Sequence, residues 1–240
     1  MKITVVIPAY NEERRIEPSL THIINYLENH FDEYEVIVVD DGSNDRTREI
    51  VSNYKNRGVR IITNNVNKGK GYSVKMGILN AQYPLVLFSD SDLATPIEEL
   101  EGFIGFIDDD FDIVIASRNL KNSDIRNKQP IYRQIMGKTF PKIVNKILLG
   151  GFKDTQCGFK LFKTDAAKKI VQLQTINGFS FDVEILFIAR KLGYRIKEAP
   201  VVWIDKEGST VRTFKDGFKM LMDIFKIKYN IFSQILSVQN

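Results

Sequence analysis

The chain has little of what several common classes of protein require. A single cysteine, Cys157, among 240 residues excludes an internal disulfide framework and a zinc site built from thiolates. There are two histidines, His22 and His30, and both lie in one helical pattern near the N-terminus, where we expect solvated rather than catalytic side chains. The net charge of +4 is too small to indicate nucleic-acid binding by itself.

Long apolar runs are also missing. No stretch reaches the roughly 18 to 20 apolar residues that a membrane-spanning helix needs. Residues 1–8 are too short and too interrupted to resemble a secretory signal peptide. We therefore expect a cytoplasmic protein that is soluble or bound peripherally to the inner face of a membrane.

Two common phosphate-binding motifs are absent as well. No Gly-x-Gly-x-x-Gly follows the first predicted strand and there is no Walker-type loop, which disfavours a dinucleotide-binding fold and a P-loop ATPase. Gly69 and Gly71 do precede a predicted helix, where backbone N–H groups can receive a phosphate with help from Lys68 and Lys70. The alternative is that these two glycines only shape the turn.

What the chain does have is a regular alternation of short apolar runs and helical patterns, with 43% hydrophobic residues to form a core. The apolar runs predict strands at residues 3–7 (stopped by Pro8), 35–39, 59–63, 85–88 and 112–116. The intervening patterns predict helices at about residues 11–29, 45–55 and 96–108, and one that follows residues 67–71 and ends near 81. This order predicts an α/β fold with a mostly parallel central sheet flanked by helices.

Two carboxylates stand at the end of the fourth predicted strand. In residues 84–93 (PLVLFSDSDL), Asp90 and Asp92 follow directly after buried apolar residues. Side chains at i and i+2 of an extended strand point to the same side, so the two acids repel each other and require a cation. A hard divalent ion with further oxygens from a diphosphate is the natural partner. The alternative is that both acids cap the helix that begins near Pro96.

Polar loops follow all four of the first predicted strands, at residues 8–12, 40–43, 67–71 and 90–92. Ligands of parallel α/β sheets bind outside the carboxyl ends of the strands, and that rule places these four loops at one edge. Helix capping alone explains four such loops poorly. The pattern therefore favours a binding site for a metal and a diphosphate.

These segments resemble the family 2 glycosyltransferases, which are inverting nucleotide-sugar enzymes with the GT-A fold. The resemblance rests on residues 6–12 (VIPAYNE), 38–43 (VVDDGS) with Asp45, 67–71 (NKGKG) and 89–92 (SDSD), which stands where the family has its Asp-x-Asp metal motif. The second half resembles the dolichyl-phosphate β-glucosyltransferase branch, with polyprenyl-phosphate mannosyltransferases as close relatives. That likeness rests on residues 154–160 (DTQCGFK), 181–184 (FDVE), the Trp203 segment and 207–209 (EGS).

The resemblance implies an inverting transfer of a hexose, glucose in the named branch, from a UDP- or GDP-sugar to a polyprenyl (dolichyl or undecaprenyl) phosphate. It also implies Mg²⁺ or Mn²⁺ as cofactor, the cytoplasmic face of a membrane as location, and no nucleic-acid partner. A mannose donor, a soluble polysaccharide or sugar acceptor, and an inactive scaffold that binds nucleotide sugars are the alternatives. Homo-oligomerisation is left open.

The resemblance further assigns roles by position. The residues expected at the nucleotide sugar are Pro8, Tyr10, Glu12, Asp41, Lys70, Asp90, Ser91, Asp92 and Gln156, with Asp41 bonded to the base and the metal held by Asp90 and Asp92. The residues expected to act in catalysis are Asp92, Asp154, Arg118 and Arg133. The two arginines match positions that bind the lipid phosphate, and Asp154 orients the acceptor or acts as a weak base. For Asp182 and Glu184 a structural role at a helix start is equally consistent.

The resemblance and the charge pattern together predict two parts. Residues 1–212 are expected to form the catalytic domain, with the nucleotide-sugar half at 1–120 and the acceptor half at 121–212. Residues 213–240 are expected to form an amphipathic helix that associates with a membrane. Basic and apolar residues are interleaved at 131–149 and again at 214–236. The alternative is that these stripes pack on the catalytic domain or on a second copy.

Overall fold

The computed structural model describes residues 1–126, 144–206 and 219–230 of the protein. The strands are β1 (Lys2–Ala9), β2 (Glu33–Asp40), β3 (Val59–Thr63), β4 (Leu85–Ser89), β5 (Ile113–Ser117), β6 (Asp124–Arg126), β7 (Phe159–Lys163), β8 (Ile196–Pro200) and β9 (Val202–Ile204). The helices are α1 (Ile16–His30), α2 (Thr47–Ser52), α3 (Lys70–Leu79), α4 (Glu99–Asp108), α6 (Thr164–Leu173) and α7 (Phe181–Lys191). There is also a 3-10 turn η1 (Lys55–Arg57), a π-helical turn η2 (Asn145–Leu149), and a helix at residues 219–230 that we call the C-terminal helix.

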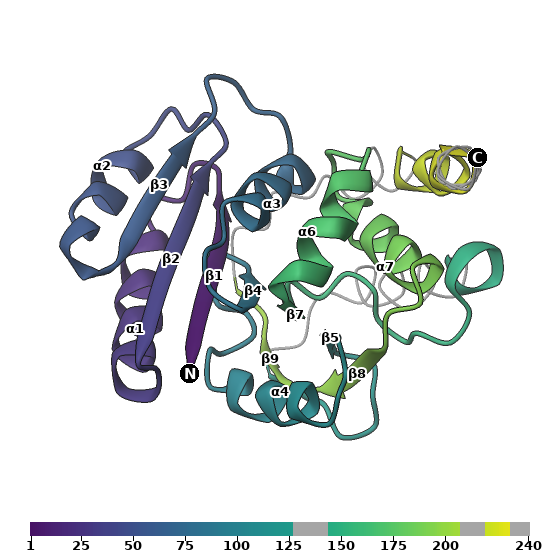
Figure 1. The fold of residues 1–240 in the computed structure, drawn as a ribbon. Helices are drawn as coiled ribbons and strands as arrows, with labels where there is room; N and C mark the ends of the chain where they lie inside the picture. The colour runs from purple at the N-terminus through teal and green to yellow at the C-terminus, as the bar shows by residue number, and fades with distance from the viewer. Residues whose placement is uncertain (127–143, 207–218, 231–240) are drawn as a thin grey trace.

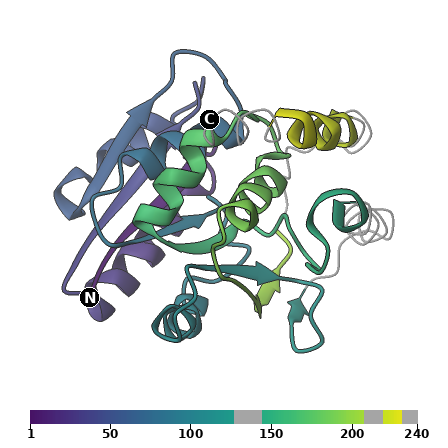
Figure 2. The same ribbon diagram turned by 45° about the vertical axis from the view of Figure 1, so that its right-hand side comes forward.

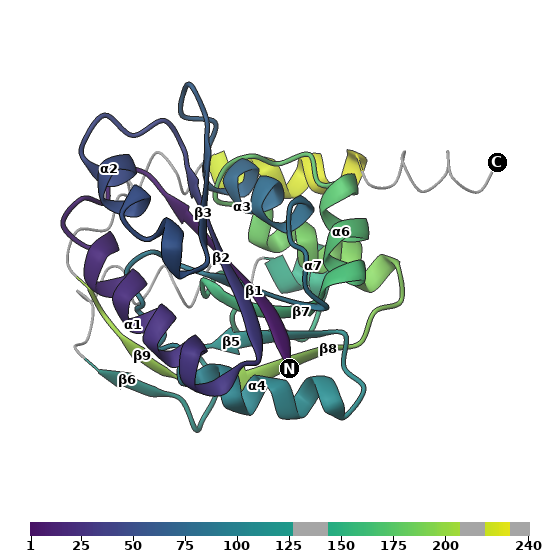
Figure 3. The same cartoon turned by 60° about the vertical axis from the view of Figure 1, so that its left-hand side comes forward.

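Within the described residues, the strands form a seven-stranded sheet of order β3-β2-β1-β4-β7-β5-β8 and a small sheet of β6 and β9. Helices cover both faces of the large sheet, α1 and α4 on one face and α3, α6 and α7 on the other (Figures 1 and 3). The expected mostly parallel α/β fold is confirmed.

The central strands are buried on both faces. In β1 and β4, Val5 and Leu87 belong to the apolar cluster under α1 and α4, whereas their chain neighbours Val6 and Phe88 belong to the cluster under α3, α6 and α7. All four side chains are 0% exposed. Burial on both faces explains why these strands appear in the sequence as continuous apolar runs instead of alternating ones.

Two of the expected element boundaries are wrong. Strand β1 continues through Pro8, which lies opposite Val39 of β2, whereas its pairing with β4 ends at Val6. The proline therefore lies where the strand has only one neighbour, a place where its missing N–H is tolerated. Helix α1 starts at Ile16, because residues 11–15 form a loop at the candidate site.

Strand β7 links the two halves of the chain. It lies between β4 and β5 and runs antiparallel to both, so that Lys160 is opposite Phe88 on one side and Ile115 on the other. An antiparallel strand begins where its neighbours end. Residues 154–158, which precede β7, therefore lie at the carboxyl ends of β4 and β5, next to the loops of the first half.

The C-terminal helix packs against the body of the protein beside α7 (Figures 1 and 2). Its Ile224 and Ile227 are 0% exposed and belong to the same cluster as α7, and Ser180 Oγ donates to Asp223 Oδ2 at 3.0 Å. No helix among the described residues combines the length and the apolar character needed to cross a membrane. The remaining parts of the predicted amphipathic segments, residues 131–143, 214–218 and 231–236, lie outside the described residues.

Candidate active site

The loops that follow β1 and β2 are bonded to each other at the carboxyl edge of the sheet. The backbone N–H of Asn11 donates to Ser43 Oγ at 2.9 Å, and that of Glu12 donates to Thr47 Oγ1 at 2.8 Å. The two strands are parallel neighbours that end in register, so their loops leave the sheet at the same place.

Asp41 joins the second loop to the third. It is 3% exposed, and its carboxylate accepts hydrogen bonds from the backbone N–H groups of Lys68 (2.9 Å) and Gly69 (2.7 Å) and from Asn64 Nδ2 (2.8 Å). Asp41 therefore holds the loop before α3, and its contact with a nucleotide base stays a prediction. Of the two glycines expected to offer N–H groups to a phosphate, Gly69 donates its N–H to Asp41 and so helps to shape the turn. Phosphate binding by this segment stays a prediction.

Glu12 connects the first loop to the segment after β4. Its carboxylate receives two hydrogen bonds from the Arg15 guanidinium, from Nε and Nη2, both at 2.7 Å. Burial raises the pKa of Glu12, and this outweighs the lowering caused by Arg15 and by a hydrogen bond from the Ser91 hydroxyl. With this contact all four polar loops meet at one edge of the sheet, as the sequence predicts.

Asp90 and Asp92 lie in a turn beyond β4, which ends at Ser89. The N–H of Leu93, whose φ is +50°, donates to Asp90 O at 3.3 Å, and the N–H of Ala94 donates to Asp92 Oδ1 at 3.0 Å. The expected extended spacing is therefore wrong, because the chain turns directly after the strand. The carboxyl groups still interact: burial is the main cause of the raised pKa of Asp92, and the negative charge of Asp90 raises it further.

Lys70, the first residue of α3, forms an ion pair with Asp90, with 2.6 Å between Nζ and Oδ1. The backbone N–H of Asp90 donates to Gly158 O at 2.9 Å, in the loop that leads into β7. A Cβ atom at position 158 would lie 2.0 Å from Asp90 Oδ2, so only glycine leaves room for this carboxylate. The segment before β7 therefore forms one wall of the carboxylate site.

A second ion pair lies behind the first. Lys160 is 0% exposed, and its Nζ pairs with Asp182 at the start of α7 and donates to Cys157 O at 2.7 Å. The ammonium groups of Lys70 and Lys160 lie 5.3 and 5.6 Å from the centroid of the same Phe88 ring. Burial raises the pKa of Asp182, against the lowering effect of the two lysine charges.

Two further polar residues have structural positions. Glu184 accepts hydrogen bonds from the N–H and Oγ1 of Thr175 (3.0 and 2.6 Å) and from the N–H of Ile176 (2.8 Å), so it anchors the loop before α7. Cys157 is 1% exposed, and burial raises the pKa of its thiol to about 11. A buried neutral thiol is a poor nucleophile, so Cys157 is a packing residue.

On the other side of Gly158, Arg118 and Asp154 form a closed ion pair. Arg118 donates to the Asp154 carboxylate from Nε (2.6 Å), Nη2 (3.0 Å) and its backbone N–H (3.1 Å). Burial is the largest single influence on the pKa of Asp154 and raises it, but the Arg118 charge and the hydrogen bonds outweigh it and hold the pKa below its ordinary value. Asp154 is therefore an ionised carboxylate and a poor proton acceptor, and its predicted role in orienting the acceptor stays a prediction.

The other predicted site residues lie at the same edge or outside the described part of the chain. Pro8 is buried near the end of β1, and Tyr10 follows it with 36% of its surface exposed. The backbone N–H of Gln156 donates to Asp154 Oδ1 at 3.0 Å. Arg133 lies outside the described residues, so its role stays a prediction.

The donor set at Asp90 and Asp92 fits a hard divalent ion. The pKa of Asp92 is raised mainly by burial and then by the Asp90 charge, against the lowering effect of Lys70 and Arg15. Among the described residues, no group of three or more histidine, cysteine or acidic side chains could hold a metal. Mg²⁺ is commonly held by one or two carboxylates and takes its other ligands from substrate phosphates and water. The two aspartates therefore suit a metal that binds together with a diphosphate.

Sequence reasoning missed Arg15 and Lys160. A signal for Arg15 is its place three residues after Glu12, within reach for a pair at the start of a helix. Lys160 stands in the strand FKLFK, where the alternation suggests a solvated face. The lysine is buried instead, because β7 has a strand on each side and helices on both faces of the sheet.

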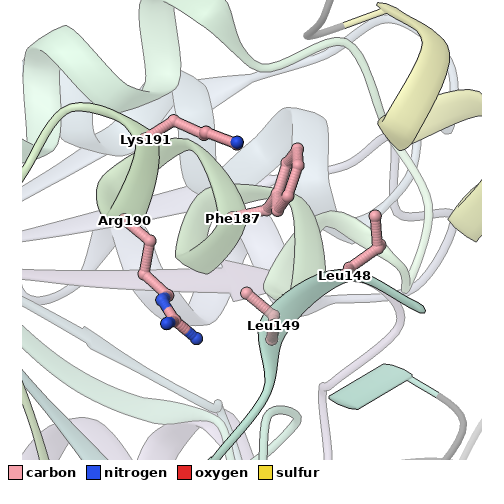
Figure 4. A pocket seen from close by; sticks show the side chains of 5 residues that line it. All are labelled: Leu148, Leu149, Phe187, Arg190 and Lys191. Carbon is pink, nitrogen blue, oxygen red and sulfur yellow. The ribbon is translucent and has the colours of Figure 1, made fainter. Parts of the chain in front are cut away.

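A shallow pocket of about 240 Å³ lies at the far end of α7 from Asp182 (Figure 4). It is lined by Leu148, Leu149, Phe187, Arg190 and Lys191. The Arg190 guanidinium donates from Nη1 to Gly150 O at 2.7 Å and so holds the end of η2 against α7. The pocket contains none of the predicted site residues.

Comparison with known proteins gives matches that cover both halves of the chain. The family model described as "Glycosyl transferase family 2" matches residues 4–171. A dolichyl-phosphate beta-glucosyltransferase from Dictyostelium discoideum is 34% identical, with 99% of this chain and 77% of that protein aligned. Dolichyl-phosphate beta-glucosyltransferase ALG5C from Trichomonas vaginalis is 35% identical, with 93% of this chain and 70% of that protein aligned.

Among solved structures, glucosyl-3-phosphoglycerate synthase from Mycobacterium tuberculosis in complex with Mn²⁺ and UDP-glucose has a similar fold. The TM-score is 0.64 at 19% sequence identity, and the match covers 93% of this chain and 77% of that one. The likeness confirms the expected GT-A fold.

Proposed function

Because the chain belongs to glycosyl transferase family 2, we propose that it transfers glucose from UDP-glucose to the phosphate of a polyprenyl lipid. Similarity to two dolichyl-phosphate glucosyltransferases over most of their length supports glucose and the lipid phosphate. The fold neighbour in complex with UDP-glucose supports a UDP-linked donor. The observation that carries the proposal is the meeting of four polar loops around Asp90 and Asp92 at the carboxyl edge of the sheet.

On the donor side, Asp90 and Asp92 would hold a divalent ion, Mg²⁺ or Mn²⁺, together with the diphosphate. When bound, this ion supplies Lewis-acid stabilisation of the negative charge that develops on the leaving diphosphate. Lys70 adds a positive charge beside the same carboxylates. Tyr10 and Glu12, in the loop after β1, border the nucleoside.

The transfer is a single displacement at the anomeric carbon of glucose. A bond forms between an oxygen of the lipid phosphate and this carbon, while the bond from the carbon to the diphosphate oxygen breaks and UDP leaves. A phosphate monoester has a second pKa near about 6 and is mostly ionised at neutral pH, so no strong general base is needed. In-line attack inverts the configuration at the anomeric carbon.

On the acceptor side, positioning matters more than proton transfer. Asp154 fixes the plane of the Arg118 guanidinium through two parallel hydrogen bonds. Among the described residues, Nη1 of Arg118 has no hydrogen-bond partner, which leaves it for an oxygen of the acceptor phosphate. Arg133 is proposed as the second arginine at this phosphate.

The C-terminal helix provides a surface that suits a membrane. Met222, Phe225 and Tyr229 are 49%, 55% and 78% exposed, and their spacing of three and four residues places them on one side of the helix. The exposed Lys226 and Lys228 lie on the same helix. An apolar stripe with neighbouring lysines suits the interface of an anionic leaflet, where each lysine contributes about 1 kcal/mol.

We propose that residues 213–240 hold the catalytic domain, residues 1–212, at the cytoplasmic face of a membrane. Flotation with vesicles that contain anionic lipid tests this, comparing wild type with the double variant Phe225→Ser/Tyr229→Ser. The double variant is expected to remain with the soluble fraction, whereas the control Val66→Ser, at another exposed apolar residue, floats like wild type. Equal flotation of all three would contradict the assignment.

The activity itself is tested by incubating the protein with Mg²⁺, a polyprenyl phosphate and radiolabelled UDP-glucose, GDP-glucose or GDP-mannose, then counting label in the organic phase. We expect extractable label with UDP-glucose that disappears with a chelator. Label from GDP-mannose alone would make the protein a mannosyltransferase. Label only in a soluble sugar acceptor would exclude the lipid, and donor binding without any transfer would indicate a scaffold.

A further inference from the structure

Two ion pairs, Asp90 with Lys70 and Asp182 with Lys160, lie near the same aromatic ring, that of Phe88. Lys70 pairs with Asp90, Lys160 pairs with Asp182, and both ammonium groups face the Phe88 ring. Because both ammonium groups lie near the same ring, the Asp182 carboxylate belongs to the ion pair that neighbours Lys70.

The two lysines are held to very different degrees. Lys160 is 0% exposed and is bonded both to Asp182 and to the Cys157 carbonyl. The Lys70 side chain is 23% exposed and has one ion-pair partner. A partly solvated lysine on a flexible four-carbon stem can change partners at small cost, whereas a buried one cannot. Of these two lysines, Lys70 is therefore the one that can move.

The present partner of Lys70 is also a ligand of the proposed metal. Its ammonium group lies 2.6 Å from Asp90 Oδ1, an oxygen that a divalent ion held by both aspartates would also use. An ammonium ion and a divalent cation at one carboxylate oxygen repel each other. Metal binding to Asp90 therefore requires Lys70 to leave this oxygen.

We propose that Lys70 is the resident counter-ion of the metal site: it holds Asp90 before the metal arrives and then moves toward Asp182 and the diphosphate. This inference rests on the proposed function, since it assumes that Asp90 and Asp92 bind the metal of a nucleotide-sugar transferase. Lys160 and Asp182 are positioning residues in this account. They keep a second carboxylate ready for Lys70 without taking part in the transfer.

If Lys70 competes with the metal for Asp90, its removal should change the affinities for Mn²⁺ and for UDP in opposite directions. Without donor, Lys70→Met is expected to bind Mn²⁺ about 3- to 10-fold more tightly than wild type, because the metal no longer displaces the ammonium group. With Mn²⁺ present, the same variant is expected to bind UDP more weakly by a similar factor, because Lys70 no longer reaches the diphosphate. Lys169→Met is the matched control, since it removes an exposed lysine from α6, which lies outside the four polar loops of the site.

A double-mutant cycle separates movement of Lys70 from a general change in the local field. Asp182→Asn is expected to weaken Mn²⁺ binding and Lys160→Met to strengthen it, each about 2- to 5-fold, and both effects should vanish in the Lys70→Met background. Circular dichroism and thermal melts show which variants fold. If Asp182→Asn does not fold, the cycle is completed with Lys160→Met, Lys70→Met and their double variant.

Mn²⁺ binding is measured by electron paramagnetic resonance of the free ion, with and without UDP, on the full chain. Tighter Mn²⁺ binding and weaker UDP binding by Lys70→Met, with Lys169→Met unchanged, supports the inference. Equal Mn²⁺ affinity of wild type and Lys70→Met overturns it while leaving the metal site intact. Persistence of the Lys160→Met effect in the Lys70→Met background also overturns it. Failure of every variant to bind Mn²⁺, even with UDP, overturns the proposed metal site as well.

Discussion

The donor side and the acceptor side of the site each contain aspartate and a cationic side chain, but they are built differently. Asp154 is 1% exposed and accepts three hydrogen bonds from Arg118, and its pKa lies below the ordinary value despite burial. Lys70 pairs with Asp90, and the pKa of Asp92 is raised by burial and by Asp90 against the lowering effect of the Lys70 and Arg15 charges. The first aspartate is held by direct hydrogen bonds from its cation, whereas burial and a neighbouring acid dominate the pKa of Asp92.

The difference supports the proposal that Asp90 and Asp92, rather than Asp154, bind the metal. A compensated ion pair such as Arg118–Asp154 stabilises its own geometry and offers a fixed guanidinium edge to a partner. Carboxylates that remain under-compensated in the folded protein cost stability, and such groups are characteristic of functional sites. On this account Asp90 and Asp92 bind a cation, and Arg118 binds an anion.

The strongest test of the comparison is Asp92→Asn. Loss of one metal-binding carboxylate should lower kcat by about 10²- to 10³-fold, since the charge on the leaving diphosphate is no longer stabilised. Stability should stay equal or rise, because the amide relieves the repulsion with Asp90. Transfer assays and urea unfolding measure both, with Asp165→Asn at the exposed start of α6 as control. Transfer at the wild-type rate would remove Asp92 from the site.

The converse change is Arg118→Met, which removes the cation of the Arg118–Asp154 ion pair. It leaves the buried Asp154 carboxylate without its partner and should reduce the free energy of unfolding by about 3 kcal/mol. Arg126→Met is the matched control, because Arg126 and Asp124 form an exposed pair whose contribution is about 0–1 kcal/mol. If the two variants unfold at the same urea concentration, the acceptor-side pair is not the structural element described above.

A smaller effect is expected from Gly158→Ala. The added methyl group would lie 2.0 Å from Asp90 Oδ2 and would displace the carboxylate, while the fold keeps its backbone contacts. We expect kcat to fall about 10- to 100-fold through misplacement of a metal ligand, with little change in melting temperature. Gly102→Ala on α4 is the control, because no atom lies within 4 Å of its added Cβ. Unchanged kcat in Gly158→Ala would show that Asp90 is not needed in its observed position.

The pH dependence of stability should differ in sign between the two sides. The pKa of Asp154 is lowered, so its contribution is present above the ordinary aspartate value of 3.8 and is lost as the pH falls through the lower, folded-state pKa. The pKa of Asp92 is raised, so the folded protein binds more protons and loses stability as the pH rises above 3.8.

Urea unfolding of wild type and Asp92→Asn in chelator, between about pH 3 and 7, measures this smallest effect. The variant should gain relative stability as the pH rises and lose that gain near pH 3. A constant difference across the range would contradict the raised pKa of Asp92.

Much of this arrangement could be predicted from the sequence. The apolar runs around Val38 and Leu87 place the parallel strands, and the rule for carboxyl ends brings the polar loops together before any contact is known. These inferences succeed because strand period and crossover handedness are local or general properties. They need no knowledge of side-chain packing.

The remainder depends on contacts between distant parts of the chain. Lys160 is buried because β7 enters between β4 and β5, and no local pattern in FKLFK signals that insertion. The bonds of Asp41 to the loop before α3 join residues 27 and 28 positions apart. The predicted extended geometry of Asp90 and Asp92 is wrong, because the chain turns after Ser89. The predicted interaction between the two carboxyl groups is present.

The most direct measurement of the central claim is a crystal structure grown with Mn²⁺ and UDP, with the metal located by its anomalous scattering. The account predicts a Mn²⁺ peak at about 2.1 Å from carboxylate oxygens of Asp90 and Asp92, with Lys70 Nζ no longer bonded to Asp90 Oδ1. A Mn²⁺ peak bound to other residues, or UDP bound with Lys70 still paired to Asp90, would contradict it.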